Sequence, residues 1–87
     1  MVDTTDDNHI LKKVVGLKQS KRVVEAGDAD IAYVAFDAQE QITQPFVKLC
    51  MQKGVPIVSQ FDMKQLAAMC KVDVPTAVMV TTKQQTS

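Results

Sequence analysis

The chain has few of the residues from which catalytic and metal centres are built. It contains one histidine, His9, and two cysteines, Cys50 and Cys70, with no CxxC pair. A zinc site or a disulfide framework needs more of these residues at closer spacing. Free cysteine packs as a small apolar side chain, so both thiols are expected to be reduced core residues. We expect no metal, no cofactor and no catalytic role for His9.

Long apolar segments are also missing. No apolar run approaches the roughly 18 residues of a membrane-spanning helix, and the acidic, polar start MVDTTDD is unlike a signal peptide. We therefore expect a cytoplasmic protein that does not contact a membrane. A length of 87 residues suits one small domain. We expect this domain at 9–82, between a flexible acidic tail at 1–8 and a polar C-terminal tail at 83–87.

Apolar spacing and capping residues predict alternating helices and strands. Thr43 is expected to N-cap a helix with Pro45 in its first turn and Gly54 at its end. Asp62 and Gln65 resemble a capping box that opens a helix reaching Cys70. The other expected elements are a short helical turn around 9–13, a helix at 18–26 with Gly27 as its C-cap, and strands at 14–15, 31–36, 55–59 and 76–81. This alternation indicates an α/β fold, a layer sandwich around a four-stranded sheet.

Positive charge is concentrated in one short stretch, although the formal net charge is zero. Residues 12–22 carry five of the ten basic residues and no carboxylate, whereas residues 1–11 carry −3 and residues 23–87 carry −2. The stretch leads into a helix start, where unpaired N–H groups and the helix dipole already favour anions. The five cations are Lys12, Lys13, Lys18, Lys21 and Arg22.

One face of that helix start has the chemistry to contact RNA bases. Lys18 and Arg22 are four residues apart, with Gln19 beside them. Lysine and arginine bond the acceptor edge of guanine, and glutamine bonds base edges. Because side chains cannot easily enter the A-form groove, the RNA would have to be bulged or kinked. The alternative is an ordinary solvated helix face.

Two further segments are expected near the basic stretch. The polar loop 37–40 follows the first long strand, and the loop 72–76 precedes the last strand. The second loop has two valines, a proline and a single charge, which is unusually apolar for a connection. Loops at one end of an α/β sheet commonly gather into a binding site. The apolar loop is either a cover over the core or a cap for a partner group such as an unstacked base.

The chain resembles the ribosomal protein L7Ae family, and most closely its small bacterial paralogues that bind kink-turn RNA. The resemblance covers residues 12–81 in order and spacing. The segments that carry it are Gly16-Leu-Lys-Gln-Ser-Lys-Arg22, Ala26-Gly27, Tyr33-Val-Ala-Phe-Asp37, Leu49-Cys50, Lys53-Gly-Val-Pro-Ile-Val58, Met63-Lys-Gln-Leu66, and Cys70 through Ala77-Val-Met-Val80.

The resemblance implies a three-layer α-β-α sandwich around a four-stranded mixed sheet. It also implies a non-catalytic, ribosome-associated protein that stabilises kink-turn RNA, a helix–bulge–helix with sheared G·A pairs. Lys18, Gln19 and Arg22 match the family's base-contacting motif. Residues 74–76 match the loop that covers a flipped-out nucleotide. The expected RNA-binding residues are Gly16, Lys18, Gln19, Lys21, Arg22, Asp37 (as a supporting carboxylate), Val74, Pro75 and Thr76, with phosphate contacts from Lys12 and Lys13.

The sequence departs from the family pattern at four positions. Ala67 and Lys71 stand where members usually have glycine, and Pro75 and Thr76 stand in a loop where small alanines are common. These departures favour the alternative of a protein-interaction module that has lost RNA binding. An enzyme or phosphoacceptor is the third alternative, but the strand-end Asp37 has no neighbouring acidic pair to hold a metal. We expect a monomer that binds RNA.

Overall fold

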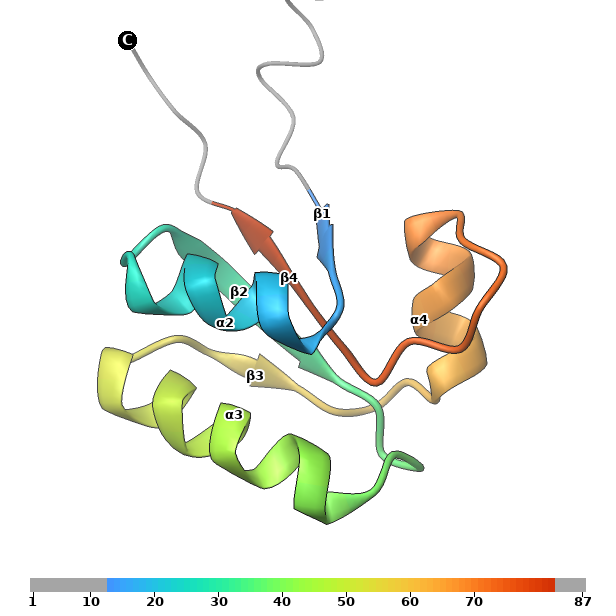
Figure 1. The fold of residues 1–87 in the computed structure, drawn as a ribbon, viewed down its shortest axis with the longest axis horizontal. Coiled ribbons are helices and arrows are strands. Elements are labelled where there is room, and N and C mark those ends of the chain that lie inside the picture. The colour runs from blue at the N-terminus through green and yellow to red at the C-terminus, as the bar shows by residue number, and fades with distance from the viewer. Residues whose placement is uncertain (1–12, 83–87) are drawn as a thin grey trace, which may run out of the picture.

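The computed structural model describes residues 13–82. The expected tails, Lys12, His9 and most of the expected helical turn at 9–13 lie outside the described residues. Lys13, the last residue of that turn, begins a strand instead. The elements, in chain order, are β1 (Lys13–Val15), α2 (Leu17–Glu25), β2 (Ala29–Val34), α3 (Glu40–Lys53), β3 (Ile57–Val58), α4 (Met63–Cys70) and β4 (Val78–Thr82) (Figure 1).

The four strands form one mixed sheet in the order β1-β4-β2-β3. β4 lies between β1 and β2 and is antiparallel to both, whereas β3 is parallel to β2. The last strand is therefore central, with Val80 opposite Val14 on one side and Ala32 on the other. The expected α/β fold with a four-stranded mixed sheet is confirmed.

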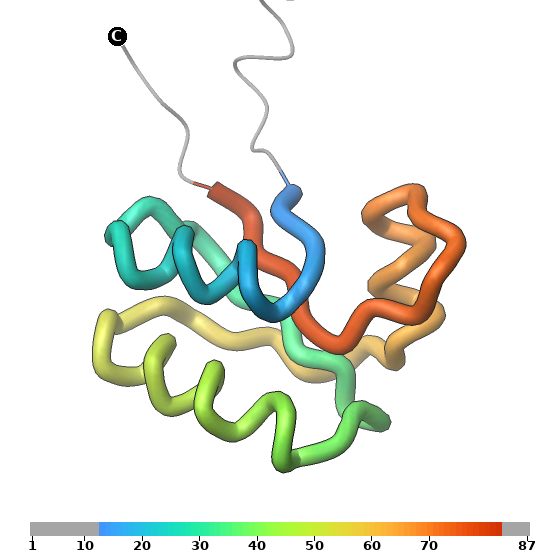
Figure 2. The backbone as a smooth tube through the Cα atoms, in the orientation of Figure 1, coloured from blue at the N-terminus to red at the C-terminus, as the bar shows by residue number. Residues whose placement is uncertain are grey.

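Alternating side chains of β4 build two separate cores. Val78 and Val80 pack with Phe46 and Cys50 of α3 on one face, and Met79 packs with Leu66 of α4 on the other. All three β4 residues are fully buried, which explains their continuous apolar sequence. Helices α2 and α3 lie next to each other on the first face, as the tube in Figure 2 shows. The result is a three-layer α-β-α sandwich.

Helices α2, α3 and α4 end in the same hydrogen-bonded motif. At the end of α2, the Gly27 and Asp28 N–H groups donate to the carbonyls of Val24 and Val23, both at 3.0 Å. This is a Schellman motif, which needs a left-handed residue just after the cap. The cap is Ala26, which is exposed, and not Gly27 as expected. The three left-handed residues are Gly27 (φ 80°), Gly54 (φ 71°) and Lys71 (φ 58°).

Helix α3 begins earlier than the sequence indicates. Its N-cap is Gln39 and Glu40 occupies the first turn, where a carboxylate is favourable. The expected N-cap, Thr43, is buried inside the helix, and its hydroxyl donates to the Gln39 carbonyl at 3.4 Å. Pro45 therefore lies inside the helix and not in its first turn. The carbonyl that loses its donor belongs to the exposed residue Gln41, where water can replace it.

The strand boundaries also shift. β2 runs from Ala29 to Val34, because Ala29 already pairs with Thr82 after the turn that ends α2. Phe36, which was expected in a strand covered on both faces, lies beyond β2 and is 64% exposed. β3 contains only Ile57 and Val58 of the expected strand 55–59. The capping box of Asp62 and Gln65 is confirmed, with hydrogen bonds of 2.7 and 2.9 Å.

Replacing Lys71 with glycine should stabilise the fold. A left-handed conformation costs an L-residue about 1–2 kcal/mol, whereas the added freedom of glycine in the unfolded chain costs about 0.4–1 kcal/mol. We expect Lys71→Gly to raise the free energy of unfolding by about 0.5–1 kcal/mol in urea titrations. The matched control is Gly54→Ala, which should lower it by a similar amount. Destabilisation by Lys71→Gly would show that the lysine side chain makes a contact that outweighs the backbone cost.

Candidate nucleic-acid interface

Gly16 forms the turn between β1 and α2. Its backbone angles, φ 97° and ψ 153°, belong to a region that is essentially restricted to glycine. The Gly16 N–H donates to the Val78 carbonyl at 3.1 Å, so the turn is attached to the first residue of β4. No heavy atom lies within 4 Å of where a Gly16 side chain would begin, so another molecule can approach the backbone closely there.

The start of α2 has the features of an anion site. No side chain caps it and no acidic residue lies in its first turn. The first hydrogen bond of the helix runs from the Ser20 N–H to the Gly16 carbonyl at 3.0 Å. The backbone N–H groups before Ser20 therefore have no partner within the helix. Lys18 and Gln19 are exposed beside these groups. The dipole and the side-chain charge therefore favour the same kind of ligand.

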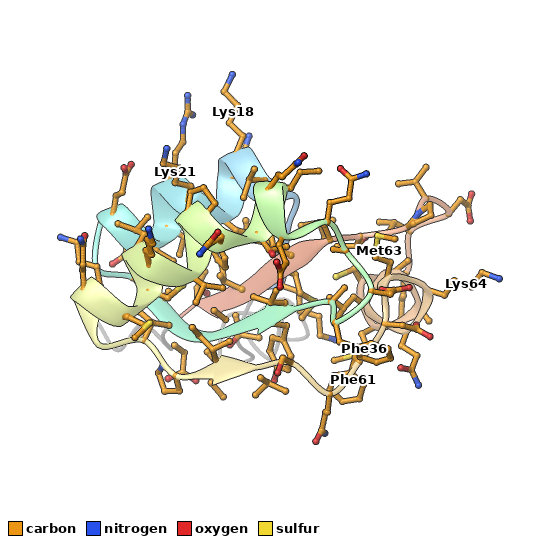
Figure 3. The ribbon with its side chains drawn as sticks, turned by 90° about the horizontal axis from the view of Figure 1, so that it is seen from below. Lys18, Lys21, Phe36, Phe61, Met63 and Lys64 are labelled. Carbon is orange, nitrogen blue, oxygen red and sulfur yellow. The ribbon has the colours of Figure 1, made fainter. Side chains whose placement is uncertain are left out.

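Ser20 determines which face of α2 meets solvent. It is fully buried, and its hydroxyl donates to the Val14 carbonyl of β1 at 3.2 Å. Its neighbours Gln19 and Lys21 are both exposed. Figure 3 shows Lys18 and Lys21 projecting away from the body of the protein. The sequence analysis missed Ser20, although its position one turn before Val24 on the buried face was a detectable signal.

The cations of α2 have no partners in the part of the chain that the structure describes. Lys18, Lys21 and Arg22 are exposed, and within residues 13–82 no carboxylate pairs with them. Lys13 is also exposed but begins β1, at the opposite end of that strand from Gly16.

The apolar loop, which extends over residues 72–77 in the structure, is partly buried and partly exposed. Val72 is half-buried, whereas Val74 is 63% exposed and Pro75 is exposed. Thr76 is buried, and its N–H donates to the Met63 carbonyl at 3.2 Å. Two of the three expected contact residues therefore face solvent, and Thr76 holds the loop in place.

Asp37 is an anchor between three segments. Its side-chain oxygen Oδ1 accepts the Met63 N–H at 2.9 Å, at the start of α4. The Met63 carbonyl in turn accepts the Thr76 N–H. The carboxylate thus links the end of β2 to α4 and, through Met63, to the apolar loop. The sequence predicted a supporting carboxylate, and this geometry gives Asp37 a positioning role.

The structure brings the basic turn, which we define as Gly16 to Arg22, and the apolar loop together at one end of the sheet. Only Thr76 and Ala77 separate Val74 and Pro75 from Val78, the partner of Gly16. The Ala35 N–H donates to the Ala77 carbonyl at 2.8 Å, which adds the end of β2 to the same edge. An exposed cationic helix start and an exposed apolar loop thus share one rigid frame.

The thiols belong to the cores and not to this interface. Both are free. Burial raises the pKa of the buried Cys50 thiol to about 11. Desolvation also raises the pKa of the half-buried Cys70 thiol, and the charge of Lys13 partly opposes that effect. Residues 13–82 hold no group of three or more His, Cys, Asp or Glu side chains arranged for a metal ion. No helix in the same range is long and apolar enough to span a membrane.

The chain is similar to known proteins over most of its length. The model of the ribosomal protein L7Ae/L30e/S12e/Gadd45 family matches residues 7–87. The RNA-binding protein TTE2299 of Caldanaerobacter subterraneus is 38% identical over 66 residues, which cover 76% of this chain and 80% of that protein. The RNA-binding protein YbxF of Geobacillus stearothermophilus is 32% identical over 68 residues, 78% of this chain and 83% of that one.

Two solved structures share the fold. A Giardia lamblia 15.5kD RNA binding protein superposes with a TM-score of 0.75 at 30% identity, covering 82% of this chain. This chain spans only 60% of that protein. A Bacillus halodurans protein of unknown function gives a TM-score of 0.74 at 14% identity, with coverage of 82% of this chain and 71% of its own.

Removing the Asp37 carboxylate should loosen the apolar loop. We expect Asp37→Ala to lower the free energy of unfolding by about 1 kcal/mol, because Met63 loses a charged acceptor at a helix start. Hydrogen exchange at the Thr76 amide should accelerate at the same time. Asp73→Ala, which removes an exposed carboxylate from the apolar loop, is the control and should change neither quantity. Unchanged Thr76 exchange in Asp37→Ala would show that the carboxylate does not position the loop.

The buried Cys50 thiol should make stability fall at high pH. Below the usual thiol pKa of 9.0 the folded and unfolded states are both protonated. Between 9.0 and about 11 only the unfolded state releases the proton, so its free energy falls relative to the folded state. The stability advantage of the wild type over Cys50→Ala in urea should therefore shrink as the pH rises through this range. An advantage that stays constant would mean that the thiol is not desolvated.

Proposed function

The chain belongs to the ribosomal protein L7Ae/L30e/S12e/Gadd45 family, and we propose that it is a non-catalytic RNA-binding protein that recognises and stabilises kink-turn RNA. The observation that carries this proposal is the pairing of a cationic helix start, whose cations have no carboxylate partner within residues 13–82, with an exposed apolar loop on one frame. RNA offers the matching chemistry, since it combines phosphates and base acceptors with bases that leave the helical stack. The similar RNA-binding proteins support the same class of ligand.

Each part of the interface has a distinct role in this proposal. Lys18, Gln19 and Arg22 contact the edges of the sheared G·A pairs, where lysine and arginine bond guanine acceptors. Lys21 contacts phosphates, as do Lys12 and Lys13 at the beginning of the domain. The open space at Gly16 admits the RNA backbone, and the charge at the helix start draws it in.

The apolar loop supplies the second half of recognition. Val74 and Pro75 cover a base that has left the stack, because an unstacked base exposes an apolar face. Thr76 and Asp37 act through the loop's position and do not touch the RNA. A plain duplex has no base to place under this loop and no widened groove for the helix start. The protein therefore selects RNA that is able to kink and stabilises that shape.

We also propose a setting for this activity. The family description supports a structural role on RNA within the ribosome, and we propose that the protein acts in the cytoplasm as a monomer. A protein-interaction module that no longer binds RNA remains the competing function, and the departures at Lys71 and Pro75 motivate it.

Binding to matched RNAs tests the proposal. We expect the wild type to bind a kink-turn RNA more tightly than a duplex of equal length without the bulge. Lys18→Ala and Arg22→Ala should each weaken kink-turn binding by about 1–3 kcal/mol, as removal of a base contact does. Lys48→Ala, which removes an exposed cation from α3, is the control and should have little effect. The logarithm of affinity should fall with the logarithm of salt concentration at a slope of about −3 to −4.

Two results would contradict the proposal. Equal affinity of the wild type for the kink-turn and the duplex would remove the claim of shape selection. A protein partner captured equally by the wild type and by a Lys18→Glu, Arg22→Glu variant, with no RNA bound by either, would favour the interaction module.

A further inference from the structure

Phe36 is an aromatic side chain that the fold leaves in solvent. The sequence has three phenylalanines and one tyrosine. Phe46 is 1% exposed and Tyr33 and Phe61 are half-buried, whereas Phe36 is 64% exposed. An aromatic ring of this size normally contributes to a core or an interface. The exposure therefore calls for an explanation in terms of a partner.

The backbone holds Phe36 rigidly. The Ala35 N–H donates to the Ala77 carbonyl at 2.8 Å, and the Phe36 N–H donates to the Phe61 carbonyl at 3.1 Å. The next residue, Asp37, is bonded to the Met63 N–H at 2.9 Å. Three consecutive residues are thus fixed to Ala77 just before β4, to the segment before α4 and to α4 itself. The backbone that carries the ring is already held in place before a ligand binds. This lowers the entropic cost of a contact with the ring.

The segments to which the Phe36 backbone is bonded carry both apolar and acidic side chains. Phe61 packs against Tyr33, with ring centroids 6.3 Å apart and planes tilted by 42°. Met63 is half-buried in the same cluster. Figure 3 shows Phe36, Phe61, Met63 and Lys64 together at the end of the protein formed by α4. The nearby carboxylates of Asp37 and Asp62 both accept N–H groups at the start of α4, which offsets part of their charge.

We propose that Phe36 is a stacking platform for an unpaired base of the RNA bound at the basic turn. This inference rests on the proposed function and adds a contact that neither the basic turn nor the apolar loop provides. Asp37, which positions the apolar loop, directly follows Phe36, so the backbone that carries the ring lies on the same hydrogen-bonded edge as the interface. A single ring on a small apolar surface matches the face of one base.

Stacking on Phe36 predicts a contact that depends on the aromatic face and not on base identity. Aromatic stacking tolerates any base, because every base has a π-face. The proposal therefore predicts that the bound RNA has at least one base that is free to leave the helix. A fully paired duplex gains nothing from the ring.

The experiment uses kink-turn RNAs carrying 2-aminopurine at each unpaired position in turn, with binding measured separately by anisotropy. Wild-type protein should quench or shift the fluorescence at one of these positions. Phe36→Ala should abolish that change and weaken binding by about fivefold or more. Phe36→Trp should preserve both, and Phe36→Leu should resemble Phe36→Ala, because leucine is apolar without an aromatic face. Met51→Ala, which truncates a 70% exposed side chain on α3, is the matched control and should bind like the wild type.

The outcomes separate this inference from the proposed function. Wild-type binding of the kink-turn with no fluorescence change at any position, or with unaltered affinity in Phe36→Ala, would overturn the platform and leave the proposed function standing. Full binding by Phe36→Leu would show that the contact is apolar and not stacking, which also overturns the inference. No preference of the wild type for the kink-turn would overturn both. Because Phe36 is mostly exposed, the variants should fold like the wild type, and thermal unfolding verifies this.

Discussion

The hydrogen bond from the Gly16 N–H to the Val78 carbonyl connects the two halves of the candidate interface. It joins the turn that opens α2 to the first residue of the central strand, directly after the apolar loop. The bond extends the pairing of β1 with β4 into the turn, one residue beyond Val15 and Met79. The separation of the cationic helix start and the exposed loop is therefore determined by the β-sheet. The proposed recognition of a kinked RNA depends on that fixed separation.

Other contacts also hold α2 and the apolar loop in their positions. Ser20 buries one side of α2 against β1, so the lysines of the helix must face solvent. On the other side, Asp37 holds the start of α4, and Met63 holds Thr76. The polar residues that were expected to contact RNA thus divide into exposed side chains and anchors. Both kinds are needed, because a contact contributes most when its geometry exists before the ligand arrives.

Local signals in the sequence predicted a large part of this structure. The capping box of Asp62 and Gln65, the glycine that ends α3 and the buried strand containing Met79 all depend on neighbouring residues, and all are confirmed. The concentration of charge in residues 12–22 also follows from the sequence alone. The resemblance to a known family then supplied the three-layer arrangement, which local pattern does not determine.

The features that the sequence did not predict depend on contacts between distant segments. Thr43 has the side chain of an N-cap, but α3 starts at Glu40 and encloses it. Phe36 continues an apolar run, yet β2 ends at Val34 and the ring is left in solvent. The bond between Asp37 and Met63 spans 26 residues and has no local signature. In each case the tertiary frame decides the outcome, and Phe36, Asp37 and Met63 lie at or next to the edge where we place the RNA.

The most direct test of the account is a titration of the labelled protein with a kink-turn RNA, followed through its backbone amide resonances. The account predicts that amides of the basic turn, from Gly16 to Arg22, and of the apolar loop, residues 72–77, shift together and with the same apparent affinity. Amides at the far end of α3, near Gly54, should remain in place. Shifts confined to only one of the two segments, or unchanged resonances at both Gly16 and Val74, would contradict the claim that they form a single RNA-binding surface.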